Sequence, residues 1–328
     1  MTTQVAPVVT DAQGPRSERG SLRVVVSGAT GLIGTALVRH LRARGDQVVR
    51  LVRAAPTTPD DVRWDPTAHD EDSVVDLARR LGRVEGLRGP GSVDAIVNLA
   101  GAPIAGQRWT SDYRVALRRS RVDATTTCAL LAGAIGSTLV NGSAVGIYGS
   151  DRGEEPLTET SAPGTTFLAG VVQDWEAATA PATDAGVRVA LARTGIVLSR
   201  HGGALAQVLP LARLGLGGPL GSGWQYWPWI TLEDEVRALT ALIDEPYSGP
   251  VNLVAPVPVH QRELMRLLGR RLHRPAVLPA PAVALRLVLG EFADDILGSQ
   301  LVRPTVLKAG GFEWAQPDPA DGVAYVVG

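Results

Sequence analysis

The sequence contains almost no lysine. Of its 32 basic residues only Lys308 is a lysine, and the others are arginines. An active site that needs a lysine earlier in the chain is therefore excluded. Cysteine is equally scarce: Cys128 stands alone, which rules out an intrachain disulfide and a cysteine-based metal cluster. Because Cys128 lies in an apolar helical pattern, we expect it to be buried in the core.

Long apolar runs, excess charge and histidine clusters are also missing. No apolar run reaches the roughly 18–20 residues that a membrane helix needs. A net charge of −1 gives no excess of positive charge that would attract nucleic acid or an anionic membrane. The five histidines are scattered without ligand spacing, so no metal site is predicted. Residues 1–20 lack the apolar segment of a signal peptide, and we expect a disordered tail on a cytoplasmic protein.

What is present is a regular alternation of apolar, β-branched runs with helical patterns. Strands are expected at Leu22–Ser27, Gln47–Val52, Ala95–Leu99, Leu139–Gly142 and Val187–Ala192, and helices at Leu32–Arg44, Val74–Leu81, Ser111–Ile135 and Phe167–Ala185. This order predicts an α/β fold of the Rossmann type, a doubly wound parallel sheet with helices on both faces. After about residue 200 glycine and proline become frequent, and Arg262–Leu272 and Pro281–Leu289 read as helices of a small C-terminal cap domain.

These patterns also give expected domain boundaries. Residues 21–200 would form the sheet domain, to which 230–256 returns with a further strand near Asn252–Val254. The cap would consist of residues 201–229 and 257–317.

The most informative stretch is Leu22–Gly34, LRVVVSGATGLIG. A strand runs into three glycines and then into a helix, which is the geometry that holds a dinucleotide pyrophosphate. Gly28 makes the tight turn, Gly31 lets the backbone approach the phosphates, and Gly34 lets the helix pack on the strand. The loop and the first helical turn are expected to contact the cofactor through Gly28, Thr30, Gly31, Leu32, Ile33 and Gly34.

Two further segments are expected at the same edge of the sheet. Asn98–Gly101 ends a buried strand, which places Leu99, Ala100 and Gly101 where ligands of such sheets bind. The strand Gln47–Val52 ends in Arg53 without an acidic residue before Asp60. An arginine there favours the 2′-phosphate of NADP(H), whereas a carboxylate would favour NAD. A solvated surface arginine is the alternative for Arg53.

Several short motifs together resemble one known family. They are GATGLIG at 28–34, NLAG at 98–101, RRSRV at 118–122, SAVGIYG at 143–149, LTE at 157–159, RTGIVLS at 193–199, GGPLGSG at 217–223, NLVAP at 252–256 and GGF at 310–312. The chain resembles the atypical, NAD-dependent epimerase/dehydratase-like branch of the extended short-chain dehydrogenase/reductases, whose members carry a small C-terminal domain of undefined function. The resemblance implies NADP(H) as cofactor, with Ser143 and Arg193 also at the cofactor site.

The chain matches the catalytic residues of this superfamily only in part. In this superfamily a Ser or Thr polarises the substrate carbonyl, a Tyr transfers the hydroxyl proton, and a Lys four residues later lowers the pKa of the Tyr. Ser143 fits the first role. The positions of the Tyr and the Lys are Phe167 and Val171, neither of which transfers a proton. Tyr148 is the remaining candidate donor, and a structural loop tyrosine or a residue of the substrate pocket is the alternative.

Aromatic residues concentrate in Gly223–Ile230, GWQYWPWI. With Phe167, the side chains of Gln225, Trp227 and Trp229 are expected to line a substrate pocket, in which Gln225 orients the ligand. A core plug between the sheet and the cap is an equally supported interpretation.

Two functions remain open from the sequence. The first is an NADP(H)-dependent oxidoreductase or epimerase-like enzyme for a small carbonyl or hydroxyl substrate, acting as a monomer or homodimer with no nucleic acid or membrane partner. The second is a non-catalytic NADP(H)-binding protein with a regulatory or scaffold role, which the missing Tyr and Lys favour.

Overall fold

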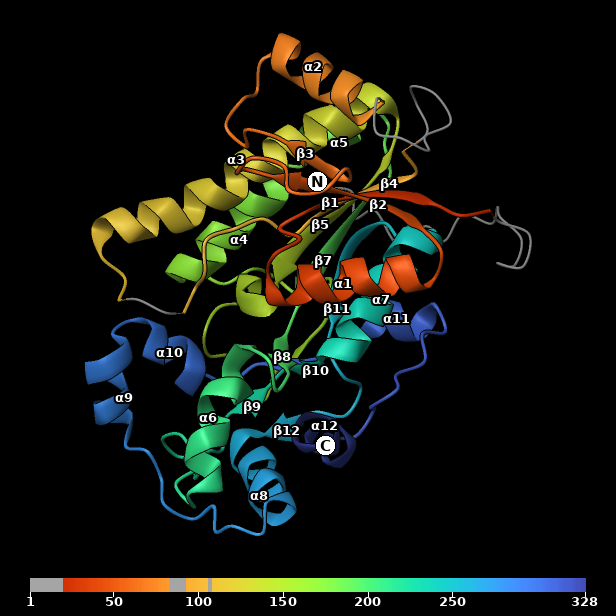
Figure 1. Cartoon of the computed structure of the whole chain (residues 1–328). Coiled ribbons are helices and arrows are strands. Elements are labelled where there is room, and N and C mark those ends of the chain that lie inside the picture. Colours follow the sequence, from red (N-terminus) through yellow and green to blue (C-terminus); the bar gives the residue numbers. More distant parts are fainter. Residues whose placement is uncertain (1–19, 83–92, 106–107) are drawn as a thin grey trace.

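A seven-stranded parallel sheet forms the centre of the computed structural model, which describes residues 20–82, 93–105 and 108–328 (Figure 1). The strand order is β11-β7-β5-β4-β1-β2-β3, and all pairs are parallel. The strands are β1 (Arg23–Ser27), β2 (Gln47–Val52), β3 (Asp61–Arg63), β4 (Ala95–Asn98), β5 (Thr138–Ala144), β7 (Val189–Thr194) and β11 (Gly249–Leu253). The order reverses on either side of β1, as in a doubly wound fold. The predicted tail lies, apart from Gly20, outside the described residues.

Helices cover both faces of this sheet because the buried strand residues alternate in direction. Val24 and Val26 belong to one core cluster and Val25 to another. The first cluster is closed by α1 (Leu32–Ala43), α7 (Leu232–Asp244) and α11 (Thr305–Ala309). The second is closed by α2 (Glu71–Leu81), α3 (Ser111–Ile135) and α5 (Ala180–Asp184). Cys128 is fully buried in the second cluster, as predicted.

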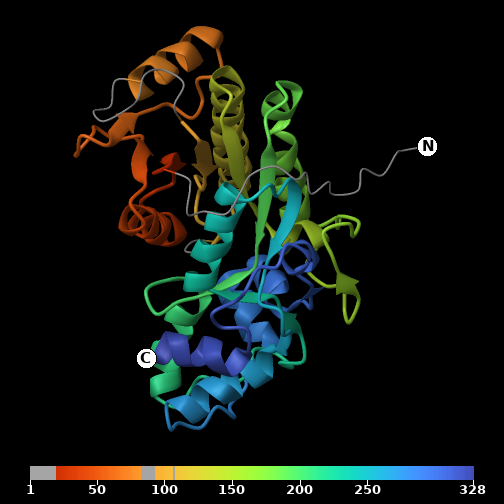
Figure 2. The same ribbon diagram turned by 90° about the vertical axis from the view of Figure 1, so that its right-hand side faces the viewer.

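The second half of the chain builds a further cluster beyond the carboxyl ends of the strands. It starts with β8 (Ile196–Leu198), which follows β7 after a single glycine and pairs with β10 (Trp229–Thr231). The cluster also contains α6 (Gly203–Arg213), β9 (Tyr226–Trp227), β12 (Val259–His260), α8 (Gln261–Arg271) and α12 (Pro319–Val327). A smaller cluster is formed by η2 (Val145–Tyr148), β6 (Pro156–Leu157), α4 (Phe167–Ala177) and β13 (Leu301–Val302). The helices α9 (Ala282–Leu289) and α10 (Phe292–Leu297) lie between α8 and β13 in the chain. In both ribbon views α6, α8 and α12 lie below the central sheet (Figures 1 and 2). Among the described residues, no helix combines the length and apolarity needed to cross a membrane.

The structure confirms the predicted fold class, and three of its differences from the predicted elements bear on the architecture. The short edge strand β3 was not expected. The single helix expected over Phe167–Ala185 is two helices, α4 and α5, because Pro181 stands in the first turn of α5. The segment around α11 was assigned to the cap, whereas Leu307 packs in the core cluster of α1 and α7. The C-terminal region thus contributes to both parts of the molecule.

Candidate functional site

The three glycines of the loop between β1 and α1 are required for different reasons. Gly28 has a positive φ of 66°, and a Cβ there would lie 2.4 Å from Leu99 O. A Cβ on Gly34 would lie 2.2 Å from Gly28 O. Gly31 has an ordinary φ of −74°, and its Cβ would meet nothing closer than Gly28 O at 3.4 Å. The fold itself therefore demands glycine at 28 and 34, whereas no contact with the described part of the chain demands it at 31.

The N-terminus of α1 is left open to an anion. Gly31 is its N-cap, no side chain caps it, and its first turn holds no acidic residue. By contrast Thr110, Thr166 and Thr231 each cap a helix with a side-chain hydroxyl. The first N–H groups of α1 lack intrahelical acceptors, and the helix dipole adds positive potential at the same point. Together with the exposed backbone at Gly31, this end of α1 has the properties of a phosphate-binding site.

The end of β4 beside this loop is held by one buried side chain. Asn98 Oδ1 accepts from Ser27 Oγ at 2.6 Å, and its Nδ2 donates to Thr125 Oγ1 at 2.9 Å and to Asn141 Oδ1 at 2.8 Å. The backbone N–H of Ala100 donates to the same Oδ1 at 3.3 Å. Asn98 thereby fixes the path of Leu99–Gly101 next to the glycine loop.

Arg53 follows β2 at the same edge, and its side chain is exposed. Within the described residues it makes no ion pair or hydrogen bond. Arg50, earlier in the strand, is held by Asp61 at 2.6 Å. Of the two arginines, Arg53 is thus the one that is available to a ligand.

Ser143, at the end of β5, donates a hydrogen bond to a carboxylate. Its Oγ donates to Glu176 Oε1 at 2.6 Å. Glu176 also accepts from Arg193 at 2.8 and 2.9 Å, through both of its carboxylate oxygens. Burial on its own lowers the pKa of Arg193, but the bonds to Glu176 and Tyr148 outweigh it and hold this pKa above its usual value. Arg193 is therefore a partner within the protein, and these contacts do not fit the cofactor-binding role that the sequence suggested for it.

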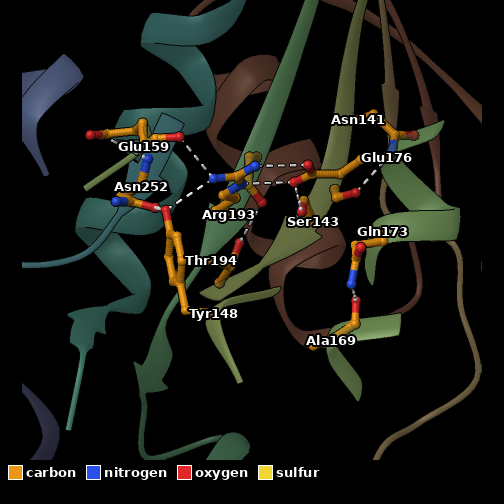
Figure 3. A network of polar contacts seen from close by, with 12 residues as sticks. Asn141, Ser143, Tyr148, Glu159, Ala169, Gln173, Glu176, Arg193, Thr194 and Asn252 are labelled. Carbon is orange, nitrogen blue, oxygen red and sulfur yellow. Dashed lines mark hydrogen bonds and ion pairs between the residues drawn. The ribbon is translucent and has the colours of Figure 1, made fainter. Parts of the chain in front are cut away.

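Tyr148 lies on the other side of Arg193 (Figure 3). It is completely buried, its hydroxyl donates to Asn252 Oδ1 at 2.7 Å, and it accepts from Arg193 Nη1 at 3.0 Å. Burial raises the pKa of Tyr148. A buried hydroxyl with both partners inside the protein does not fit the predicted proton donor. It fits the structural alternative for Tyr148.

Phe167 and Val171 lie one turn apart on α4, as their spacing predicts. Phe167 is partly exposed, its ring packs against Trp109 with centroids 5.6 Å apart, and the Arg114 guanidinium lies 4.1 Å from its centroid. Val171 is buried. The first turn of α4 thus presents an aromatic ring where a tyrosine hydroxyl would be needed.

The substrate pocket expected from GWQYWPWI is not formed by the predicted residues. Gln225, Trp227 and Trp229 are at most 5% exposed. Their polar atoms are bonded inside the protein: Gln225 Nε2 donates to Leu220 O, and the two indole N–H groups donate to Ile296 O and Val257 O, each at 3.0 Å. These contacts fit the core-plug interpretation of the three side chains and do not fit the pocket interpretation.

The exposed aromatic residues of this segment are its neighbours. Trp224 and Tyr226 line an open cavity of about 850 Å³, together with His260 and residues of α8 and α12. No lining residue of this cavity belongs to the glycine loop or to the ends of β1, β4 and β5.

Sequence reasoning missed three charged residues. Glu176 holds Ser143, and Arg121 and Glu235 are buried ionisable side chains. Arg121 had a detectable signal, because it shares the apolar stripe of α3 at helical spacing with Leu117, Ala124 and Cys128. Burial raises the pKa of Glu235 to about 8, against the opposing effect of a 2.7 Å hydrogen bond from Thr194 Oγ1.

Comparisons with known proteins agree with this architecture. Residues 24–255 match the NAD dependent epimerase/dehydratase family, and residues 280–324 match a domain of unknown function, DUF1731. An epimerase family protein of Mycobacterium bovis is 42% identical over 307 residues, which is 92% of this chain and 96% of that protein.

Solved structures are similar as well. The human epimerase family protein SDR39U1 (isoform 2), crystallised with NADPH, is 32% identical with a TM-score of 0.79, over 93% of this chain and 99% of that one. A nucleoside-diphosphate sugar epimerase of Corynebacterium glutamicum is 34% identical with a TM-score of 0.74. The similarity covers 94% of this chain but only 59% of the Corynebacterium chain. With its glycine loop, parallel sheet and C-terminal domain, the chain belongs to the NAD dependent epimerase/dehydratase family.

Proposed function

We propose that this protein binds NADP(H) across the carboxyl edge of β1, β4 and β5. The observation that carries the proposal is Gly31: its missing side chain has no explanation inside the protein, and it lies at the uncapped N-terminus of α1. Backbone there can approach a pyrophosphate, and the helix end supplies N–H donors. The human relative with NADPH supports the same ligand.

The choice of NADP(H) over NAD(H) rests on Arg53. An exposed guanidinium at the end of β2 with no partner among the described residues can bind a 2′-phosphate through charge-assisted hydrogen bonds.

The chemistry proposed is that of an oxidoreductase or epimerase-like enzyme on a small carbonyl or hydroxyl substrate. A bound nicotinamide supplies or accepts hydride. Ser143, at the end of β5, is the hydroxyl placed to contact a substrate carbonyl, and it donates to the carbonyl only after it turns away from Glu176. Since Tyr148 is buried and Phe167 has no hydroxyl, the proton comes from water or from the substrate itself.

A non-catalytic NADP(H)-binding role is the second candidate. The same bond between Ser143 and Glu176 favours it, because in this arrangement the only catalytic hydroxyl that the family pattern retains is occupied.

Titration calorimetry with NADPH and NADH separates cofactor binding from chemistry. We expect NADPH to bind more tightly than NADH, and equal affinities would contradict the assignment of Arg53. The NADPH-loaded protein is then offered a panel of aldehydes, ketones and sugar nucleotides, with NADPH absorbance as the readout. Because an epimerase returns the hydride to its substrate, the sugar nucleotides are also incubated with the NADP⁺-loaded protein and their products are separated by chromatography. Oxidation of NADPH, or conversion of a sugar nucleotide without it, supports the enzyme, and tight binding with neither supports the second candidate.

A further inference from the structure

A buried arginine that pairs with no carboxylate among the described residues lies directly under the candidate site. Arg121, on the inner face of α3, is 7% exposed. Its Nη1 donates to Leu117 O, one turn earlier on the same helix, at 3.0 Å. Its guanidinium carbon lies 5.2 Å from the ring centroid of Trp175 on α4. No ion pair with a described residue accompanies these contacts.

The other arginines of α3 show that this is unusual. Arg114 pairs with Glu291 at 2.8 Å, Arg118 with Asp174 at 2.5 Å, and Arg119 with Asp123 at 3.7 Å. All three are more exposed than Arg121. The most buried cation of the helix is thus the one that lacks an acidic partner in the described part of the chain.

Burial of the Arg121 charge without an acidic partner among the described residues has an electrostatic cost. Desolvation lowers the pKa of Arg121 to about 10, so that the side chain still carries its charge at neutral pH. A charge taken out of water is tolerated when a counter-charge or a set of hydrogen bonds replaces the lost hydration. For Arg121 the protein supplies one carbonyl and one aromatic face.

The position of Arg121 indicates where a counter-charge would come from. A Cβ placed on Gly101 would lie 3.2 Å from Arg121 Cγ and 3.3 Å from Cζ, so the guanidinium lies directly against this glycine. Gly101 is exposed and ends the Leu99–Gly101 segment at the carboxyl edge of β4. Leu99 O in turn packs on Gly28 of the phosphate-binding loop.

We propose that Arg121 is an anion-binding residue of the site, which receives an oxyanion of the bound ligand next to Gly101. The proposal rests on the proposed cofactor function. The planar fork of an arginine suits phosphate and carboxylate oxygens, which it binds with two parallel hydrogen bonds. The oxyanion is a phosphate oxygen of the dinucleotide, or a phosphate or carboxylate of the substrate that lies beside it.

The variant Arg121→Met tests this inference because it removes the charge and keeps an unbranched apolar side chain. Arg119→Met, on the exposed face of the same helix, is the matched control. Affinity for NADPH is measured by calorimetry, and inorganic phosphate is titrated into the NADPH-saturated protein. Thermal unfolding is followed for each variant with and without NADPH.

We expect Arg121→Met to weaken NADPH binding by about tenfold or more, which corresponds to a lost charge-assisted hydrogen bond. Arg119→Met leaves the affinity unchanged. The ligand-free Arg121→Met protein unfolds at the same temperature as the unaltered protein or a higher one, since an apolar side chain replaces an unpaired buried charge. A residue with a purely structural role would instead lower this temperature.

The remaining outcomes show whether the oxyanion belongs to the dinucleotide or to the substrate. If NADPH affinity is unchanged but Arg121→Met abolishes the binding of phosphate to the NADPH-saturated protein, the oxyanion belongs to the substrate. If both affinities are unchanged, or if ligand-free Arg121→Met is destabilised, the inference is wrong. If the unaltered protein does not bind NADPH at all, the proposed function fails, which is a different result from a failure of Arg121 alone.

Discussion

Ser143 Oγ donates a hydrogen bond to Glu176 Oε1 at 2.6 Å, and Glu176 is held in turn by one edge of the Arg193 guanidinium, through Nε and Nη2. The hydroxyl that the family pattern assigns to a substrate carbonyl is therefore part of a buried ionic arrangement (Figure 3). Arg193 continues this arrangement to Tyr148 and to Glu159 O. Arg193 therefore contributes to the stability of the folded protein and also holds the carboxylate that binds the Ser143 hydroxyl.

The first prediction concerns that arginine. Arg193→Met leaves Glu176, whose side chain is only 12% exposed, without its cation, so we expect a loss of about 3 kcal/mol in the free energy of unfolding. Arg266→Met, which breaks the exposed pair with Glu263, should cost about 0–1 kcal/mol. Urea unfolding measures both. Similar losses for the two variants would show that the Arg193 pair contributes no more than a surface pair.

The second prediction distinguishes the glycines of the loop. Gly31→Ala meets no close contact in the protein, so its unfolding free energy should stay within about 0.5 kcal/mol of the unaltered protein while NADPH binding weakens. Gly34→Ala places a Cβ 2.2 Å from Gly28 O and should cost about 1–3 kcal/mol. Chemical unfolding and calorimetry on the same samples give both quantities. Undiminished NADPH affinity in Gly31→Ala would remove the main support for the binding loop.

The third prediction concerns the end of β2. Arg53→Ala removes an exposed side chain without a partner among the described residues, so it should leave the fold intact. We expect its NADPH affinity to fall by about tenfold or more, because a charge-assisted contact to the 2′-phosphate is lost. NADH affinity, measured on the same variant, should not change. A parallel fall for both cofactors would mean that Arg53 acts on a group that the two share.

The fourth prediction separates a structural from a catalytic role for Tyr148. Tyr148→Phe leaves Asn252 Oδ1 without its donor in the interior and should destabilise the protein by about 1–3 kcal/mol. NADPH affinity should be unaffected. Tyr226→Phe is the control, since Tyr226 is partly exposed and its ring stacks on His260. Unchanged stability together with a slower reaction on any identified substrate would restore Tyr148 as a proton donor.

The fifth prediction uses pH. The pKa of Glu235 is raised from 4.5 to about 8 in the folded protein, chiefly by burial. Between these two values the unfolded chain has lost a proton that the folded protein keeps, so Glu235 makes stability fall as pH rises. Glu235→Gln imitates the protonated form. The difference in the free energy of unfolding between Glu235→Gln and the unaltered protein should be small near pH 4.5. It should grow in favour of the variant up to about pH 8 and then level off, as measured by unfolding at a series of pH values.

The sequence predicted the parts of the fold that depend on local patterns. The loop at Gly28–Gly34, the strand that ends at Asn98, and Phe167 and Val171 on one helix are all read from residues close together in the chain. The alternatives that the sequence left open concern partners that lie far apart. Tyr148 is bonded to Asn252, 104 residues later, and Trp227 to Ile296, 69 residues later. A run of aromatic residues fits a pocket or a core equally well until those partners are placed.

The interlocking of the C-terminal region with the central sheet has a consequence for the order of folding. Glu159 Oε1 accepts from the backbone of Asn252 in β11 and from that of Val306, at 3.2 and 3.1 Å. Asp234, on α7, accepts from the backbone of Ala315 and Gln316 at 2.7 and 2.9 Å. The first core cluster contains Leu307 of α11, so a growing chain completes this cluster, and then the two hydrogen bonds to Asp234, only after residue 316 has been synthesised. If synthesis stalls between β11 and α11, the released chain holds all seven strands of the central sheet and the whole second core cluster, while the part of the first cluster that Leu307 covers stays exposed, and such apolar surface promotes aggregation.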